Sequence, residues 1–145
     1  MTAQSYPRSP KVLLGGMAHL ARFIDKVRLR HAGQIQDYNY VTTGFDKYLI
    51  EFLRFDPYEF ERQVLAGLAD DALLNWVYGH GRRPTAEEIR QWNERILAGA
   101  PKDDMTRQRF QNRLTEIAAK RGVSVADLPP VATWAEVIDL DEGRM

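Results

Sequence analysis

Residues 17–31 read MAHLARFIDKVRLRH, and this stretch decides the fold class. At about 100° per helical residue, its apolar side chains gather on one broad face of a helix. That face holds Met17, Leu20, Ala21, Phe23, Ile24 and Val27. His31 falls near the centre of the same face and Arg28 at its edge. The opposite side holds His19, Arg22, Lys26 and Arg30. We therefore expect a helix that packs one face into a core and carries charge beside that core.

The charged residues of this run allow two interpretations. Asp25 lies three positions from both Arg22 and Arg28, so its carboxylate can contact either guanidinium. In the first interpretation, Asp25 and Arg28 form a partly buried ion pair, in which loss of one partner costs about 3–5 kcal/mol. In the second, Arg22, Lys26 and Arg28 bind a carboxylate or phosphate and Asp25 orients them. The sequence leaves both open.

Helix signals follow one another along the rest of the chain. The first helix is expected over about 17–32, with Gly33 as its stop residue. The expected helix starts are Thr43 with Asp46, Asp56 with Pro57, Asp70 with Asp71, Thr85 with Glu88, Asp103 or Asp104, and Thr133 with Glu136. Only residues 34–42, QIQDYNYVT, hint at alternation, and they predict a loop or one short extended segment. The pattern predicts an all-α fold, a single compact bundle of about six or seven helices.

The length of 145 residues is typical of one domain, so residues 1–145 are expected to form a single all-helical domain. Residues 1–16 are expected to be an N-terminal arm, punctuated by prolines and a glycine pair. Residues 82–121 carry ten basic and six acidic side chains, whereas residues 122–145 carry one basic and five acidic. We expect the acidic C-terminal segment to pack back on the basic one. The alternative is a basic surface that is kept for a partner.

Composition excludes several classes of function. The chain has no cysteine, which excludes disulfides, thiolate nucleophiles and cysteine zinc sites, and suits a cytoplasmic location. No signal peptide or membrane span is expected. The formal net charge is zero and no nucleic-acid-binding motif is present, so a nucleic-acid partner is not expected. The three histidines are His19, His31 and His80, and none has the helical spacing of a metal site, so neither a metal nor another cofactor is expected.

Several segments together resemble a known family. They are YPRSPKVLLGGMAHLARFIDKVR (6–28), GFDKYLIEFL (44–53), FERQVL (60–65), DDALLNWV (70–77) and DLDEGR (139–144). The strongest motif is Leu-x-Arg-x-Ile-Asp-Lys-x-Arg, formed by Leu20, Arg22, Ile24, Asp25, Lys26 and Arg28. With these segments the chain resembles the small bacterial proteins of domain of unknown function 5069 (DUF5069). The resemblance implies a bacterial, stand-alone, helical protein, and it implies no particular activity or catalytic residue.

The sequence favours a binding function near the first helix. We expect a small anionic molecule, or an acidic group of a partner, to be bound there. The expected residues are Arg22, Asp25, Lys26 and Arg28, with Tyr38, Tyr40 and Asp46 as walls of the site. A different class of function is a protein–protein interaction or self-association module without a small-molecule site. An enzyme of unknown class comes third, and the oligomeric state stays open.

Overall fold

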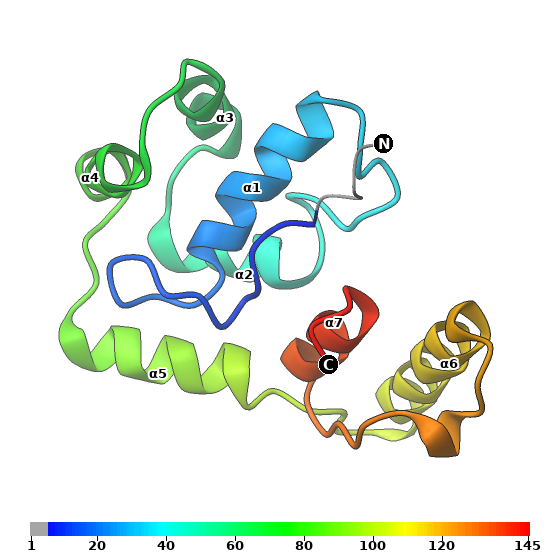
Figure 1. Ribbon diagram of the computed structural model, residues 1–145. Helices are drawn as coiled ribbons and strands as arrows, with labels where there is room; N and C mark the ends of the chain where they lie inside the picture. Colours follow the sequence, from blue (N-terminus) through cyan, green and yellow to red (C-terminus); the bar gives the residue numbers. More distant parts are fainter. Residues whose placement is uncertain (1–5) are drawn as a thin grey trace. The chain divides into compact units, whose positions relative to one another are not determined.

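A computed structural model of the protein describes residues 6–145 (Figure 1). These residues contain seven α-helices, one short 3-10 helix and no β-strand. The α-helices are α1 (Leu20–His31), α2 (Gly44–Leu53), α3 (Pro57–Leu65), α4 (Asp70–His80), α5 (Ala86–Leu97), α6 (Asp104–Arg121) and α7 (Trp134–Asp141), and the 3-10 helix η1 is Val125–Asp127. Residues 34–42 form a loop. The predicted all-α fold is confirmed.

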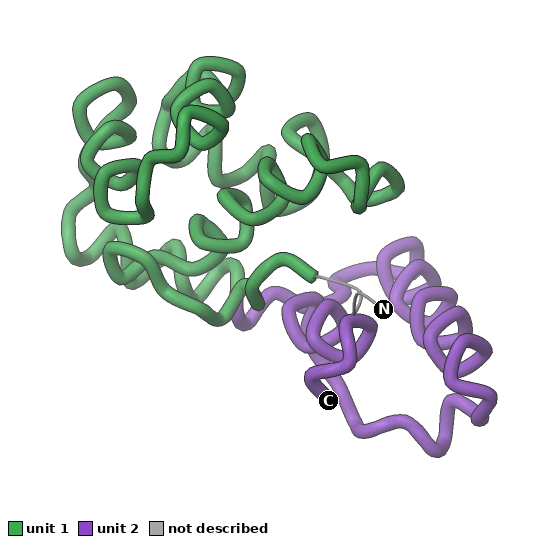
Figure 2. The backbone as a smooth tube through the Cα atoms, turned by 45° about the horizontal axis from the view of Figure 1, so that its top comes forward, with its two compact units in different colours: residues 1–96 green, residues 97–145 purple. Residues whose placement is uncertain are grey.

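The chain divides into two compact units, residues 1–96 and residues 97–145 (Figure 2). Each unit has its own apolar interior. The expectation that residues 1–145 form one domain stays a prediction.

The first unit is built around α1. Leu20, Phe23, Ile24 and Val27 of this helix are buried, and α1 packs against α3. The ring of Phe23 stacks on the ring of Phe60 from α3, with 5.5 Å between the ring centroids. Close aromatic packing of this kind adds about 0.5–1.5 kcal/mol to the burial of the rings. The apolar face predicted for residues 17–31 is therefore the face that meets the core.

The predicted polar side of this helix is buried too. His19, Arg22 and Lys26 are only 1 %, 4 % and 5 % exposed, whereas Arg28 and His31, which the sequence places at the apolar face, are exposed. The assignment of faces from periodicity alone was wrong for these residues. A helical wheel uses only the pattern of apolar residues along one helix. It contains no information on the arm and α2, which cover the charged side of α1 and supply hydrogen-bond partners for it.

The N-terminal arm makes a tight turn before α1. Leu14 and Met17 exchange two backbone hydrogen bonds of 3.0 Å across Gly15 and Gly16. Both glycines have positive φ, +60° and +77°, as a two-residue hairpin turn requires. A side chain at Gly15 would also collide with Leu74 of α4, at 2.8 Å from its Cβ position. The turn occupies residues 14–17, so α1 begins at Leu20 and not near residue 17.

The second unit pairs α6 with α7. Its buried core consists of Phe110, Leu114 and Ile117 from α6 with Val137 and Leu140 from α7. At the edge of this core, Arg113 and Lys120 of α6 form ion pairs with Asp141 of α7, at 2.7 and 3.4 Å. Within this unit, one acidic residue of the C-terminal segment, Asp141, thus pairs with two basic residues of α6.

Replacement by alanine is expected to have opposite effects on stability at two nearby glycines at the end of α4. A Cβ at Gly81 would overlap the backbone carbonyl oxygen of Leu53, which accepts a hydrogen bond of 2.9 Å from the Arg82 amide. Gly81→Ala is therefore expected to lower the free energy of unfolding by about 2 kcal/mol, as overpacking does. Gly79 lies inside α4 with nothing within 4 Å of its Cβ position. Gly79→Ala is expected to raise stability by about 0.5–1 kcal/mol, and urea unfolding of both variants checks the pair. Equal effects of the two changes would contradict this packing.

Candidate functional site

The most deeply buried polar cluster of the first unit surrounds the Asp46 carboxylate. Asp46 lies in the first turn of α2 and is 1 % exposed. Its Oδ2 accepts hydrogen bonds from Lys26 Nζ at 2.8 Å and from the Val41 amide at 3.1 Å. Its Oδ1 lies 2.6 Å from His19 Nε2. Asp46 therefore does not complete the capping box that was predicted with Thr43, whose side chain makes no cap hydrogen bond.

The charges of this cluster are set by burial and by the neighbours. Burial opposes ionisation of Asp46, but the hydrogen bond from His19 and the Lys26 ammonium outweigh it and hold the pKa of Asp46 below its usual value. Burial lowers the pKa of His19, and the charges of Lys26 and Arg22 act in the same direction, against the opposite pull of Asp46. A neutral His19 then donates its Nε2 proton to Asp46. Its Nδ1 is left buried, with no hydrogen-bond partner among the described residues.

Backbone strain gathers at the same carboxylate. His19 and Val41 have φ values of +74° and +60°, although neither is glycine. Such a conformation costs on the order of 1–3 kcal/mol, and most for a β-branched residue such as Val41. The side chain of His19 and the amide of Val41 both bond to Asp46. This carboxylate therefore holds two strained residues in place.

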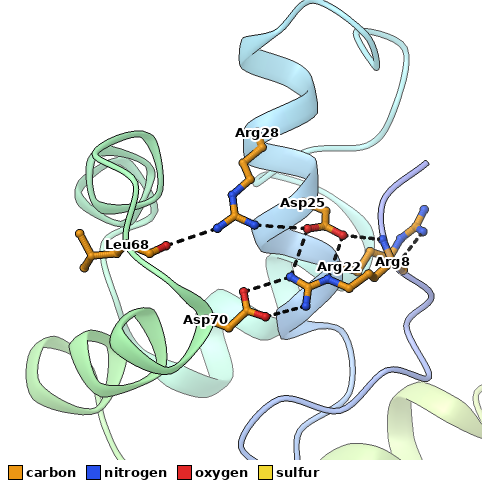
Figure 3. Close-up of polar contacts among 6 residues, drawn as sticks. All are labelled: Arg8, Arg22, Asp25, Arg28, Leu68 and Asp70. Atoms are coloured by element: carbon orange, nitrogen blue, oxygen red, sulfur yellow. Dashed lines mark hydrogen bonds and ion pairs between the residues drawn. The ribbon is translucent and has the colours of Figure 1, made fainter. Parts of the chain in front are cut away.

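A second cluster joins the arm, α1 and α4 (Figure 3). Arg8 donates to Asp25 from its backbone amide and from Nε, both at 2.9 Å, and to Asp70 from Nη1 at 2.6 Å. Arg28 lies 3.6 Å from Asp25 and donates to the carbonyl of Leu68 at 3.3 Å. Arg8 lowers the pKa of Asp70 through this contact. Asp25 therefore serves mainly to fix the arm to α1, and it has the predicted contact with Arg28 as well.

The remaining predicted residues are distributed around these clusters. Arg22 is buried, donates to the Arg8 carbonyl at 3.2 Å and lies 5.9 Å from the ring centroid of Tyr38. Tyr40 belongs to neither cluster. The contacts bring together three pairs of predicted residues: Lys26 with Asp46, Asp25 with Arg28, and Arg22 with Tyr38. The sequence analysis missed Arg8, His19, Arg30, Glu61 and Asp70 as site residues.

Tyr40 lines a hollow of about 300 Å³ at the C-terminal end of α1. Its other lining residues are Val27, Arg30, His31, Gln36, Glu61 and Leu65. The Tyr40 hydroxyl donates to Glu61 Oε1 at 2.6 Å, and the Arg30 guanidinium lies 4.6 Å from the centroid of the Tyr40 ring. Burial and Glu61 both raise the pKa of Tyr40, so its hydroxyl stays protonated as the donor.

Arg30 differs from the other cations of α1. Lys26 is paired with Asp46, and Arg28 with Asp25. Within residues 6–145, no carboxylate forms an ion pair with Arg30. Its guanidinium group lies over the ring of Tyr40 instead. A half-buried cation that borders a hollow can form a contact with an anion that enters it.

Comparison of the sequence with models of protein families tests the family resemblance that the motifs indicated. The model of DUF5069, a domain of unknown function, matches residues 4–144, nearly the whole chain. The chain belongs to the DUF5069 family. No curated protein matches the sequence. The bacterial origin and cytoplasmic location expected of this family member stay predictions.

Two further features of this DUF5069 protein concern metal binding and the membrane. Among the described residues, no three side chains of the histidine, aspartate or glutamate type gather as a metal-binding group would require. No helix in the described part of the chain is long and apolar enough to cross a membrane.

The Asp46 cluster gives a stability prediction. Asp46→Asn keeps the shape of the side chain but removes the negative charge that pairs with the buried Lys26 ammonium. We expect the free energy of unfolding to fall by about 3–5 kcal/mol. Asp37→Asn, in the exposed part of the preceding loop, is the matched control and is expected to change it by less than about 0.5 kcal/mol. Equal stability of the two variants in urea unfolding would show that Asp46 is not required as an ion.

His19 gives a pH prediction. Because the pKa of His19 in the folded protein lies below 6.5, the unfolded chain binds more protons than the folded one just below that pH. Stability is therefore expected to fall as the pH drops from about 7 through 6. His19→Asn removes this titration, and asparagine tolerates positive φ, so the variant is expected to show a shallower slope between pH 7.5 and 5. His31→Asn, at an exposed histidine of the same helix, is the matched control. Urea unfolding at several pH values checks both variants, and a wild-type slope in His19→Asn would contradict the prediction.

Proposed function

We propose that this DUF5069 protein binds a small molecule that carries an anionic group, in the hollow at the C-terminal end of α1. Arg30 supplies the main cationic contact, with His31 and Gln36 beside it. The observation that supports this proposal is the Arg30 guanidinium. It borders a hollow of about 300 Å³ and has no carboxylate partner in the described chain. An acidic group of a partner protein would use the same contact.

This anion site lies near the first helix, as the sequence predicted, but it uses other residues than the predicted ones. The expected site residues Lys26, Arg28, Asp25 and Asp46 satisfy one another or other groups of the fold. An external anion would have to compete with these contacts, and breaking a buried ion pair costs several kcal/mol. Of the expected residues, Tyr40 remains as a wall of the site.

The end of α1 suits an anion better than a helix C-terminus ordinarily does. Helix C-termini carry partial negative charge on carbonyl groups that lack partners. Here the Arg28, Leu29 and Arg30 carbonyls accept hydrogen bonds from Ala32, Gln34 and Gly33 amides, respectively. The Gln36 side chain also donates to the Arg30 carbonyl at 3.0 Å. These bonds reduce the repulsion that a bound anion would meet.

The residues that line the hollow also indicate the size and polarity of the part of the ligand that is not anionic. Val27 and Leu65 provide apolar surface, and Leu65 is 44 % exposed. The volume lies at the lower end of the range for ligand sites. A carboxylate on a short branched hydrocarbon chain meets both requirements.

Titration with 4-methylpentanoate, followed by ¹H–¹⁵N NMR, tests the proposal. The amides of residues that line the hollow, such as Gln36 and Tyr40, are expected to shift with saturation. Arg30→Met keeps the length of the side chain and removes its charge. It is expected to weaken binding about tenfold or more, as loss of a charged hydrogen bond does.

Arg95→Met is the matched control. The Arg95 guanidinium also lies over a tyrosine ring, 4.4 Å from the centroid of Tyr48, but it does not line the hollow. This variant is expected to bind the probe as the wild type does. Absence of saturable shifts at the hollow, or equal binding by Arg30→Met and wild type, would overturn the proposal.

A further inference from the structure

We infer that the ligand of this hollow is a zwitterion of the amino-acid class, with an ammonium group held by Glu61 as well as a carboxylate held by Arg30. The inference rests on the proposed function and adds the second charge. It follows from two opposite charges that border one hollow without pairing with each other in the described chain.

Tyr40 keeps these two charges apart. Its ring face carries the Arg30 guanidinium, 4.6 Å from the ring centroid, and its hydroxyl donates to Glu61 Oε1 at 2.6 Å. The two charged groups therefore contact different parts of one rigid side chain. Oppositely charged side chains that are free to move would pair directly, so Tyr40 holds them as separate positive and negative contacts.

Glu61 retains the capacity to bind a cationic donor. A carboxylate has about four lone-pair positions on two oxygens, and the Tyr40 hydroxyl uses one of them. A ligand ammonium would add charge-assisted hydrogen bonds to the remaining positions. A ligand with a carboxylate alone would leave the Glu61 charge without a counter-ion and would bring a second negative charge near it.

Chemistry of this kind is found in α-amino acids with an apolar side chain. The carboxylate and ammonium groups of such a ligand are attached to the same carbon atom. One small ligand can therefore contact Arg30 and Glu61 at the same time. Val27 and Leu65 supply the apolar surface for the side chain. Arg30 and Glu61 come from α1 and α3, so such a ligand would bridge the two helices.

Three matched probes test the inference. They are leucine, 4-methylpentanoate, which lacks only the amino group of leucine, and 3-methylbutan-1-amine, which lacks only its carboxylate. Leucine is expected to bind about tenfold more tightly than either of the other two, measured by NMR titration of the full chain. Glu61→Gln keeps an acceptor for the Tyr40 hydroxyl and removes the charge. It is expected to reduce leucine binding to the level of 4-methylpentanoate.

Glu59→Gln, an exposed position on the same helix that does not line the hollow, is the control and is expected to keep the preference for leucine. Equal affinity for leucine and 4-methylpentanoate, with both dependent on Arg30, would overturn this inference and leave the proposed function standing. Binding of neither carboxylate, or binding that does not depend on Arg30, would overturn both. Retention of the leucine preference by Glu61→Gln would show that Glu61 does not hold the ammonium group.

Discussion

The first unit depends on one buried carboxylate. Asp46 joins α2 to the charged side of α1 through Lys26 and His19, and to the loop between these helices through the Val41 amide. A charge in the interior is tolerated only where its hydrogen bonds are satisfied and a counter-charge is near. Since the cluster joins three segments, α1, α2 and the loop between them, it fixes the positions of those segments as well as the charge. It explains why α1 is buried on its polar side.

Local sequence signals predicted the helices well because caps act over three or four residues. Asp56, Asp103 and Thr133 accept the expected hydrogen bonds from the first turns of α3, α6 and α7. Thr85 and Glu88 form the expected reciprocal pair at the start of α5. The family resemblance was also visible in short motifs and is confirmed.

The site could be predicted only in part, because its contacts join residues that are far apart in the sequence. Arg8 meets Asp25 and Asp70 across 17 and 62 positions, and nothing in the arm marks it as their partner. Asp46 has the right spacing from Thr43 for a cap, so its role inside the fold is hidden by a plausible local one. The sequence predicted charge beside the core at α1, but the buried cations are Arg22 and Lys26 from the predicted polar side, whereas Arg28 is exposed. Which charges are satisfied there is decided by neighbours that only the folded chain brings together.

The buried cluster and the hollow are linked through two adjacent residues. The Val41 amide bonds to Asp46, and this bond holds Val41 at a φ value of +60° that a β-branched residue avoids. Tyr40 precedes Val41, so the direction in which its ring leaves the backbone depends on that conformation. The ring in turn supports the Arg30 guanidinium and its hydroxyl supports Glu61. The Asp46 cluster therefore bears on the position of Tyr40, and through Tyr40 on Arg30 and Glu61, the two charged groups of the proposed site.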